Sequence, residues 1–367
     1  MKITIVGAGI GGLTAALALH REGHQVSIVE RATRLEPLGA GIVLAPNAVR
    51  ILHALDVSVE AYGRQLRKAT MQTASGIKIQ AMEFDQFLSG VGPVLAFHHA
   101  ELHAILLAAL PRDVTLRLGC PFVNGASYGE DLLVGADGIN SVVRQCVPGA
   151  KALRYSGYTC WRAVLPDPGI GETFEAWGGA ARIGAAPLTR NRVYVFLVLT
   201  APAGMPRQTS MAGIRRHFQA FCDPVPMILD VARDVVLLHH DIEDADAPVW
   251  GQGRTVLIGD AAHPMTPNLG QGAAMAIEDA AVLPEVIASN APAEALRKIR
   301  HDRVAKVLQD SRRLGRMAHM ENPVACWLRN ALVRSVPQSI SGNQYLRLME
   351  PGMEIADRIA PHRTKYV

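Results

Sequence analysis

The sequence is poor in cysteine and aromatic residues, and it has no long run of one charge sign. Its five cysteines among 367 residues are scattered, without a CxxC pair or a neighbouring histidine at zinc-ligand spacing. We therefore expect a reduced, cytoplasmic protein with no metal site. Basic residues are spread along the chain and the formal charge is only +4, so no nucleic-acid partner is expected.

Long hydrophobic runs are also missing, which argues against a membrane-spanning segment. The first 19 residues are apolar enough to imitate a signal peptide, but their glycines and the lack of a basic start fit a folded unit better. The length and the 49% hydrophobic content favour two interlocked domains.

A glycine-rich turn opens the chain. "KITIV" predicts a strand, "LTAALALHREG" a helix and "QVSIVE" a second strand. Between the first two, "GAGIGG" places Gly7, Gly9 and Gly12 at the positions of a GxGxxG motif. These glycines permit a tight turn, the approach of a pyrophosphate and close packing of the helix on the strand. A glycine-rich turn without a ligand is the alternative, and the strand and helix in register argue against it.

An acidic residue follows at the distance that a dinucleotide site requires. Glu30 ends the second predicted strand, where a carboxylate accepts hydrogen bonds from ribose hydroxyls. Arg31 directly follows and is assigned to the same site. A carboxylate here disfavours a 2′-phosphate, so FAD or NAD is expected in preference to NADP.

A second turn lies in "DLLVGADGINSVVR". Residues 132–134 predict a strand, followed by a turn with Asp137 and Gly138 and a helix capped by Asn140 or Ser141. Asp137 is either an ordinary capping acid or a ligand contact.

A third stretch, "TVLIGDAAHPMTPNLGQGAAMAIEDA", selects the cofactor. Its strand ends in Asp260, whose carboxylate can bind a polyol hydroxyl, and Pro264 and Pro267 prevent an early helix. The next helix is expected to start near Gly270, and its free N–H groups would face the negative charge of a reduced flavin. His263 is expected to shape this loop, with base chemistry as the alternative.

In order, "GAGIGG", "VGADGINSVVR" and "GDAAHPMTPNLGQGAAMAIEDA" resemble the three fingerprints of the FAD-dependent aromatic hydroxylases, the single-component flavoprotein monooxygenases with the para-hydroxybenzoate hydroxylase fold. The resemblance runs from residue 1 to about residue 335. "CWRAVLP", "EAWG" and "WLRNALVRSVP" also look like bacterial 2-alkyl-4-quinolone 3-monooxygenases. The family implies FAD as cofactor, NADPH or NADH as co-substrate and molecular oxygen as oxidant.

The resemblance also implies roles for single residues. Asp260 would bind the flavin ribityl chain, Pro267 would lie beside the isoalloxazine ring, and Gly270, Gly272 and Ala273 would present backbone to its pyrimidine edge. Asp137 and Gly138 would serve FAD and the passing NAD(P)H, and Gly39 and Gly41 would allow the flavin ring a close approach. His99 stands where relatives usually carry an FAD-contacting arginine, so FAD is expected to be held less tightly.

The middle of the chain predicts an antiparallel sheet that covers the flavin. Its strands are expected at 154–165, 173–178, 181–188 and 192–200. The expected pocket is lined by Tyr158, Trp161, Trp177, Arg182, Tyr194 and Phe196. For each aromatic taken singly, core packing or a cross-strand pair is favoured over substrate contact. Arg182 could hold an ionised substrate or a structural carboxylate such as Glu175. Arg182, Tyr194 and Pro267 are the candidates for positioning substrate or flavin. His239 and His240 adjoin on a strand and should point to opposite faces.

The predicted fold class is α/β, with a Rossmann-like FAD-binding domain, an interleaved antiparallel substrate domain and C-terminal helices. The ranges are 1–70, 96–150 and 250–290 for the first, 71–95 and 151–249 for the second, and 291–367 for the last. The basic amphipathic helix after residue 291 is expected to cover the domain junction, and contact with a membrane surface is the less favoured use. A monomer or homodimer is expected.

The leading functional hypothesis is an FAD-dependent NAD(P)H monooxygenase that hydroxylates a small aromatic or heteroaromatic ring through a flavin C4a-hydroperoxide. A 2-alkyl-4-quinolone, attacked at carbon 3, is the first candidate substrate, and the same chemistry on urate, salicylate, pyridine or a polycyclic phenol is also considered. A flavin NAD(P)H oxidase is a second hypothesis, and a non-catalytic flavoprotein is a third.

Overall fold

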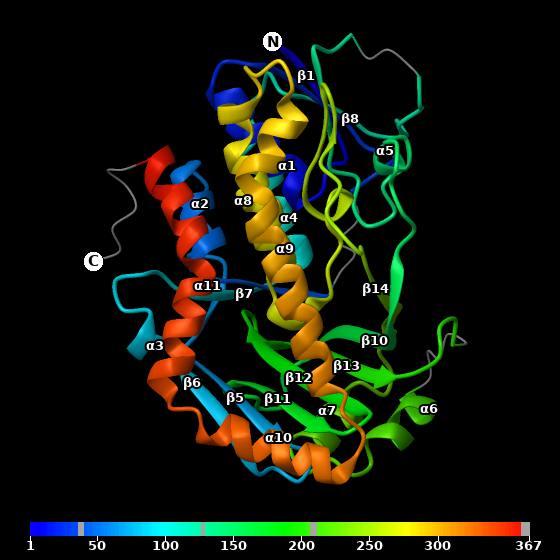
Figure 1. Cartoon of the computed structure of the whole chain (residues 1–367). Helices are drawn as coiled ribbons and strands as arrows, with labels where there is room; N and C mark the ends of the chain where they lie inside the picture. Colours follow the sequence, from blue (N-terminus) through cyan, green and yellow to red (C-terminus); the bar gives the residue numbers. More distant parts are fainter. Residues whose placement is uncertain (36–39, 126–128, 206–210, 361–367) are drawn as a thin grey trace.

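The computed structural model describes residues 1–35, 40–125, 129–205 and 211–360. It contains two stacked parts, one built on the sheet that includes β1 and β8 and the other on the sheet that includes β10 to β13 (Figure 1). The long helix α9 (Pro292–Ala318) runs along both parts (Figure 1). The predicted α/β fold class is confirmed.

The first sheet has six strands in the order β15-β16-β9-β1-β2-β8. These strands are β1 (Lys2–Val6), β2 (Gln25–Val29), β8 (Thr115–Arg117), β9 (Leu132–Gly135), β15 (Gly251–Gln252) and β16 (Thr255–Leu257). All pairs are parallel except β15 with β16 at the edge. Helix α1 (Ile10–Arg21) follows β1, so the predicted strand, turn, helix and strand are confirmed. Apolar β-branched residues fill the central strands because helices cover both faces.

Helices and a small sheet lie around this first sheet. They are α2 (Pro46–Ala54), α4 (His99–Ala108) and α5 (Val142–Gln145), with β3 (Gly41–Leu44), β4 (Arg64–Leu66) and β7 (Val94–His98). The three strands pair in the order β3-β7-β4. The short helix α3 (Phe84–Phe87) precedes β7.

The second sheet has seven strands in the order β14-β10-β13-β12-β11-β5-β6. They are β5 (Lys68–Thr73), β6 (Lys78–Glu83), β10 (Arg154–Pro166), β11 (Thr173–Gly178), β12 (Ala181–Leu188), β13 (Arg192–Thr200) and β14 (Leu238–Asp244). The four predicted strands are therefore confirmed as β10 to β13. The antiparallel pairing expected for the middle of the chain is confirmed for β10 to β14, and the sheet also contains one parallel pair, β5 with β11. No hairpin joins these two strands, so no tight turn sets their relative direction.

The two faces of the second sheet differ. One face packs into an apolar core with α6 (Met211–Arg215), η1 (Arg216–Phe218) and α7 (Val225–Val231). Strand alternation turns every second side chain to the opposite face of this sheet. The second sheet thus has one face buried against helices α6 and α7 and another that is partly exposed.

The last third of the chain connects the two parts. Turns η2 (Gly259–Ala261) and η3 (Pro267–Leu269) lead into α8 (Gly272–Val286), and α10 (Pro323–Ser335) and α11 (Gln338–Ile359) follow α9. Helix α10 crosses the end of the molecule below the second sheet, and α11 returns along α2 (Figure 1). Within the described residues, no helix is long and apolar enough to cross a membrane. The domain limits drawn from the sequence stay a prediction.

A buried ion-pair network joins α8 to α9. The Arg300 guanidinium lies 2.8 Å from a Glu278 carboxylate oxygen and 2.7 Å from an Asp279 oxygen, and all three side chains are buried. Burial alone would raise the pKa of Asp279, but His263 and Arg300 outweigh it and hold that pKa at about 2. The Asp279 carboxylate is therefore charged at neutral pH and needs its cation.

Arg300→Met should lower the free energy of unfolding at pH 7 by about 3–5 kcal/mol, because Glu278 and Asp279 lose a buried cation. These carboxylates keep their ion pairs with Arg303 and His263. Without the guanidinium the pKa of Asp279 rises, so this loss should shrink as the pH falls to about 5. In the unsubstituted protein, by contrast, the ionised Asp279 carboxylate stabilises the fold. This stabilisation is present above about pH 4 and is lost as the pH falls toward 2, because the folded-state pKa is the lower one.

Urea denaturation at both pH values measures this difference, and Lys306→Met, at an exposed position of the same helix, is the control. A loss for Arg300→Met that grows on acidification would contradict the assignment.

Candidate functional site

In the glycine turn after β1, neighbouring backbone leaves no room for a side chain at Gly7 and Gly12, whereas there is room for one at Gly9. A Cβ on Gly12 would lie 2.0 Å from the Gly7 carbonyl oxygen. A Cβ on Gly7, whose φ is +103°, would lie 2.5 Å from the Ala136 carbonyl oxygen. A Cβ on Gly9 would meet nothing within 4 Å. Gly9 is exposed at the start of α1, which has no side-chain cap. This end of the helix thus offers free N–H groups and space for an anion.

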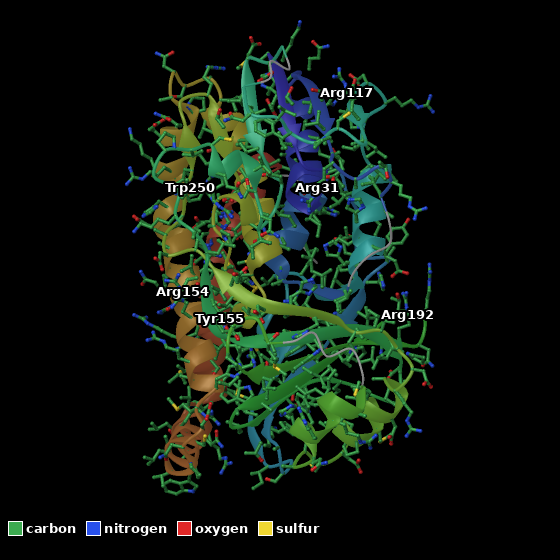
Figure 2. All side chains as sticks on the ribbon, turned by 90° about the vertical axis from the view of Figure 1, so that its right-hand side faces the viewer. Arg31, Arg117, Arg154, Tyr155, Arg192 and Trp250 are labelled. Carbon is green, nitrogen blue, oxygen red and sulfur yellow. The ribbon has the colours of Figure 1, made fainter. Side chains whose placement is uncertain are left out.

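Glu30 lies directly after β2 and is partly committed to the backbone. Its two carboxylate oxygens accept hydrogen bonds from the backbone N–H groups of Ala8 and Ala32, each at 2.9 Å. A carboxylate has about four acceptor positions, so two remain for ribose hydroxyls. Arg31 is exposed, and Figure 2 shows it in the upper part of the molecule, well above Tyr155.

Helix α4 brings two histidines toward the glycine turn. His103 Nε2 lies 2.7 Å from the Ala8 carbonyl oxygen, which can only accept, so this nitrogen donates. His99 lies one turn earlier and is half-buried. Burial, followed by the charges of His103 and His98, lowers the pKa of His99, so its ring is neutral at pH 7. The sequence did not single out His103, although its spacing of four residues from His99 was a usable signal.

The turn after β9 is held by its own acid. The Asp137 carboxylate accepts hydrogen bonds from Ser141 Oγ at 2.5 Å and from the backbone N–H groups of Val142 at 2.7 Å and Val143 at 3.2 Å. Asp137 thus caps α5, one of the two roles considered for it, and Ser141 is the N-cap residue. Gly138, at φ +79°, has open space beside it.

Asp260 lies in η2 after β16, with its side chain exposed. The Arg144 guanidinium fixes this turn by donating to the backbone oxygens of Asp260 at 2.9 Å and Ala261 at 3.1 Å. The sequence had not singled out Arg144 within its motif.

The loop before α8 exposes its backbone over a buried polar layer. Pro267 and Gly270 are exposed, and Gly272 and Ala273 are half-buried at the uncapped start of α8. Gly270, at φ +63°, ends η3 and allows the chain to turn into α8. The predicted position near Gly270 is therefore confirmed within two residues.

His263 shapes this loop from beneath. Its Nε2 lies 2.5 Å from an Asp279 carboxylate oxygen, and both side chains are fully buried. The same Asp279 oxygen accepts the Gly259 N–H at 3.0 Å. Since His263 cannot reach a ligand surface, the structural role predicted for it is the one observed.

Across from these turns, the second sheet presents Arg162, Tyr194 and Phe196, all half-exposed. They lie on adjacent strands β10 and β13, where Arg162 pairs with Phe196. The Phe196 ring lies over Gly184, where a Cβ would come within 2.1 Å of it. A Cβ on Gly41 in β3 would similarly lie 2.3 Å from the Tyr194 side chain. The missing side chain at Gly41 thus accommodates Tyr194, whereas Gly39 lies outside the described residues.

The other expected pocket residues are not open. Trp161 points to the opposite face, fully buried, and stacks on His239 with ring centroids 4.6 Å apart. The prediction that Trp161 lines the pocket was wrong, because Tyr158 and Cys160 lie on one face of β10 and Trp161 lies on the other. Tyr158 and Trp177 are on the expected face but buried. His239 is buried and the adjacent His240 exposed, which confirms that they point to opposite faces.

Arg182 binds the structural carboxylate, one of its two considered partners. Its guanidinium lies 3.0 Å from Glu175 and donates to the Asn268 side-chain oxygen in η3. Asn268 in turn donates to the Tyr158 hydroxyl at 2.9 Å. Arg182 is buried, and these contacts tie the loop before α8 to the second sheet.

Arg162 is the functional candidate that sequence reasoning missed. Among the ion pairs of the described residues, none involves its guanidinium. The Cys160 thiol, chiefly, and also Tyr194 and Asp260 raise its pKa. The sequence could have pointed to Arg162, because it lies on the same face of β10 as Tyr158 and Cys160. No acid occupies a neighbouring position on that face.

The residues described above therefore lie on two surfaces, and Asp260 of the first is near enough to Arg162 of the second to raise its pKa. The first joins the turns with Gly9, Gly138, Asp260 and Gly270, and the second contains Tyr194 and Phe196 beside Arg162. Figure 2 shows Arg192, the first residue of β13, at the level of this second sheet and below Arg31. The arrangement suits a dinucleotide on the first surface and a small ring against the second.

Comparisons with known proteins agree with this geometry. Residues 1–117 and 129–311 match the family described as "FAD binding domain". The chain is 35% identical over 361 residues to the aurachin C monooxygenase/isomerase of Stigmatella aurantiaca, covering 91% of this chain and 94% of that protein. It is also 35% identical to the 2-heptyl-3-hydroxy-4(1H)-quinolone synthase of Pseudomonas aeruginosa strain UCBPP-PA14, covering 97% of this chain and all, 100%, of that protein.

Among solved structures, Klebsiella pneumoniae HpxO in complex with FAD and uric acid superposes with a TM-score of 0.86 at 27% identity, covering 96% of this chain and 97% of that chain. The cofactor expected from the sequence, FAD, is thereby confirmed. The chain belongs to the FAD binding domain family and is an FAD-dependent aromatic monooxygenase.

Proposed function

We propose that this protein consumes NADPH or NADH to hydroxylate a small, mostly apolar aromatic ring, with a 2-alkyl-4-quinolone as the first substrate to test. One observation carries the proposal. The half-exposed face of the second sheet offers two aromatic rings, Tyr194 and Phe196, beside a single cation, Arg162, that has no carboxylate partner among the ion pairs of the described residues. Such a face favours an aromatic ring that carries an acceptor oxygen.

The residues present fit FAD. The uncapped start of α1 at Gly9 would hold the pyrophosphate, and Glu30 retains two acceptor positions for the ribose. Asp260 would bind a ribityl hydroxyl, and the uncapped start of α8 would face the pyrimidine edge of the flavin.

When bound, FAD would accept a hydride from the nicotinamide and activate molecular oxygen. This chain's own residues have the tasks of binding and orientation. Tyr194 and Phe196 place the substrate ring, and the Arg162 guanidinium donates to its oxygen. The free N–H groups at the start of α8 would stabilise negative charge on the bound cofactor. The contact between Arg182 and Asn268 holds the loop before α8 against the second sheet. No side chain in this arrangement acts as a covalent nucleophile.

The quinolone class is supported by the relatives and by the chemistry of the face. One relative is named a 2-heptyl-3-hydroxy-4(1H)-quinolone synthase, at nearly full coverage of both chains. A 4-quinolone has one ring carbonyl oxygen for Arg162 and an apolar remainder for the aromatic side chains. Urate, named with a solved relative, is more polar and would leave several of its groups against apolar rings.

The FAD-loaded protein should oxidise NADPH or NADH faster when 2-heptyl-4-quinolone is added, with one oxygen consumed per nicotinamide and little peroxide released. Oxygen uptake, nicotinamide absorbance and peroxide are followed together, and protein without quinolone is the control. Full conversion of oxygen to peroxide for every ring tested would establish an oxidase instead. Bound FAD that neither nicotinamide reduces would indicate a non-catalytic flavoprotein.

Arg162→Gln should raise KM for the ring substrate by about tenfold to a hundredfold, since a charge-assisted hydrogen bond contributes about 1.5–3 kcal/mol. FAD content and thermal stability should remain close to those of the unsubstituted protein, because the side chain is half-exposed.

Arg162→Lys, which keeps the charge, should recover part of the affinity. Arg182→Gln is the matched comparison and should lower thermal stability, since it breaks buried contacts to Glu175 and Asn268. An unchanged KM in Arg162→Gln would exclude Arg162 from substrate binding.

A further inference from the structure

The outer side of α10 is an apolar stripe in contact with solvent. Val324, Trp327, Leu328 and Leu332 have exposed fractions of 65%, 68%, 49% and 68%. Their spacing of three and four residues places them on one side of the helix, where Ala331 is also exposed. Helix α10 forms the lower end of the molecule in Figure 1, opposite the end that carries β1.

The inner side of the same helix is firmly seated. The Arg329 guanidinium lies 4.7 Å from the centre of the Trp177 ring and donates to the Met317 carbonyl oxygen at 2.6 Å. Val333 joins the apolar cluster around Trp177. The Asn322 side chain caps the helix by accepting from the N–H groups of its first turn, each at 3.0 Å. The apolar stripe therefore belongs to a helix with a fixed orientation, and its exposure is not a result of fraying.

Arginines outnumber acids in the part of the chain that contains the stripe. Residues 322–349 contain three arginines and no aspartate or glutamate. Residues 311–349 contain six arginines and one acid, Glu321, so their net charge of +5 exceeds the +4 of the whole chain, and the remainder carries a net −1. Arg334 is exposed and lies two turns after Trp327, at the flank of the stripe. Arg312 and Arg313 pair with Asp244 and Asp310, and Arg329 is buried, so the exposed positive charge of this range comes from Arg316, Arg334 and Arg347.

We propose that α10 is an interfacial helix that seats this protein on an anionic lipid surface. Trp327, Leu328 and Leu332 would enter the boundary between headgroups and acyl chains, and Arg334 would pair with anionic headgroups. The helix lies along the surface and does not cross it, in agreement with its 13 residues. Contact with the membrane surface was the less favoured use expected for this region of the sequence.

Charge decides between a lipid surface and a second copy of the chain. In a twofold-symmetric dimer on this face, each stripe would meet the same stripe, and the arginines of both copies would be brought together. Desolvated charges of like sign repel each other, whereas an anionic bilayer neutralises them and covers the apolar side chains at once. This inference does not depend on the proposed substrate.

The test uses vesicles of equal parts phosphatidylcholine and phosphatidylglycerol, with pure phosphatidylcholine vesicles for comparison. The full-length, FAD-loaded protein should float with the anionic vesicles and be released by high salt. Trp327 is the exposed tryptophan of the four, since Trp161, Trp177 and Trp250 are buried. Its fluorescence should therefore shift to shorter wavelength on binding, and Trp327→Phe should bind while losing the shift.

The combined substitution Trp327→Gln and Leu332→Gln should weaken partition into anionic vesicles by at least about tenfold, because two apolar side chains no longer enter the bilayer. Arg334→Gln should weaken it by about fivefold. Val236→Gln with Ile77→Gln, at exposed apolar positions elsewhere, is the matched control and should bind normally. Retained FAD absorbance and thermal stability show that each variant is folded.

Three outcomes would overturn the proposal. One is the absence of partition into anionic vesicles, and another is equal partition of the α10 variant and its control. The third is an unsubstituted dimer, measured by light scattering, that the α10 variant converts to a monomer without any vesicle binding. That last result would assign the stripe to a second copy of the chain.

Discussion

The close packing of two backbone turns, one after β1 and one after β9, is the constraint on which the nucleotide-binding part depends. A side chain on Gly12 would overlap the Gly7 carbonyl, and one on Gly7 would overlap the turn after β9. Because both positions lack a Cβ, α1 lies against β1 and β9, and its first N–H groups emerge at the exposed Gly9. The geometry that binds a phosphate is therefore a consequence of how tightly the chain packs beneath it.

The site also depends on polar contacts that hold its loops and do not touch a ligand. Arg144 fixes the backbone of the turn that carries Asp260, and His263 with Asp279 supports the same turn from below. Arg182 and Asn268 connect the loop before α8 to the second sheet. These buried groups position the two surfaces relative to each other, so that the exposed residues are left to bind cofactor and substrate.

Local pattern predicted the elements well where alternation or glycine spacing was clear. In strand β13, buried residues alternate with half-buried ones over its first six positions, because one face packs on a helical core and the other is partly open. The parallel pairing of β5 with β11 could not be predicted, since it joins segments far apart in the sequence with no turn between them. Trp161 was misplaced because aromatic character was weighed and strand parity was not, and Arg162 was missed for the same reason. Gly41 fits a packing role with Tyr194 that only the tertiary structure shows.

The most direct test of this account compares Gly9→Ala with Gly12→Ala. The open space at Gly9 predicts that the apoprotein of Gly9→Ala keeps its melting temperature while its FAD affinity falls by at least about tenfold, because the new methyl group occupies the phosphate position. Gly12→Ala should lose both stability and FAD, since its methyl group meets backbone 2.0 Å away. Melting curves of the apoproteins and FAD titration by fluorescence measure both quantities. Full FAD affinity in Gly9→Ala would contradict the assignment of this turn to the cofactor.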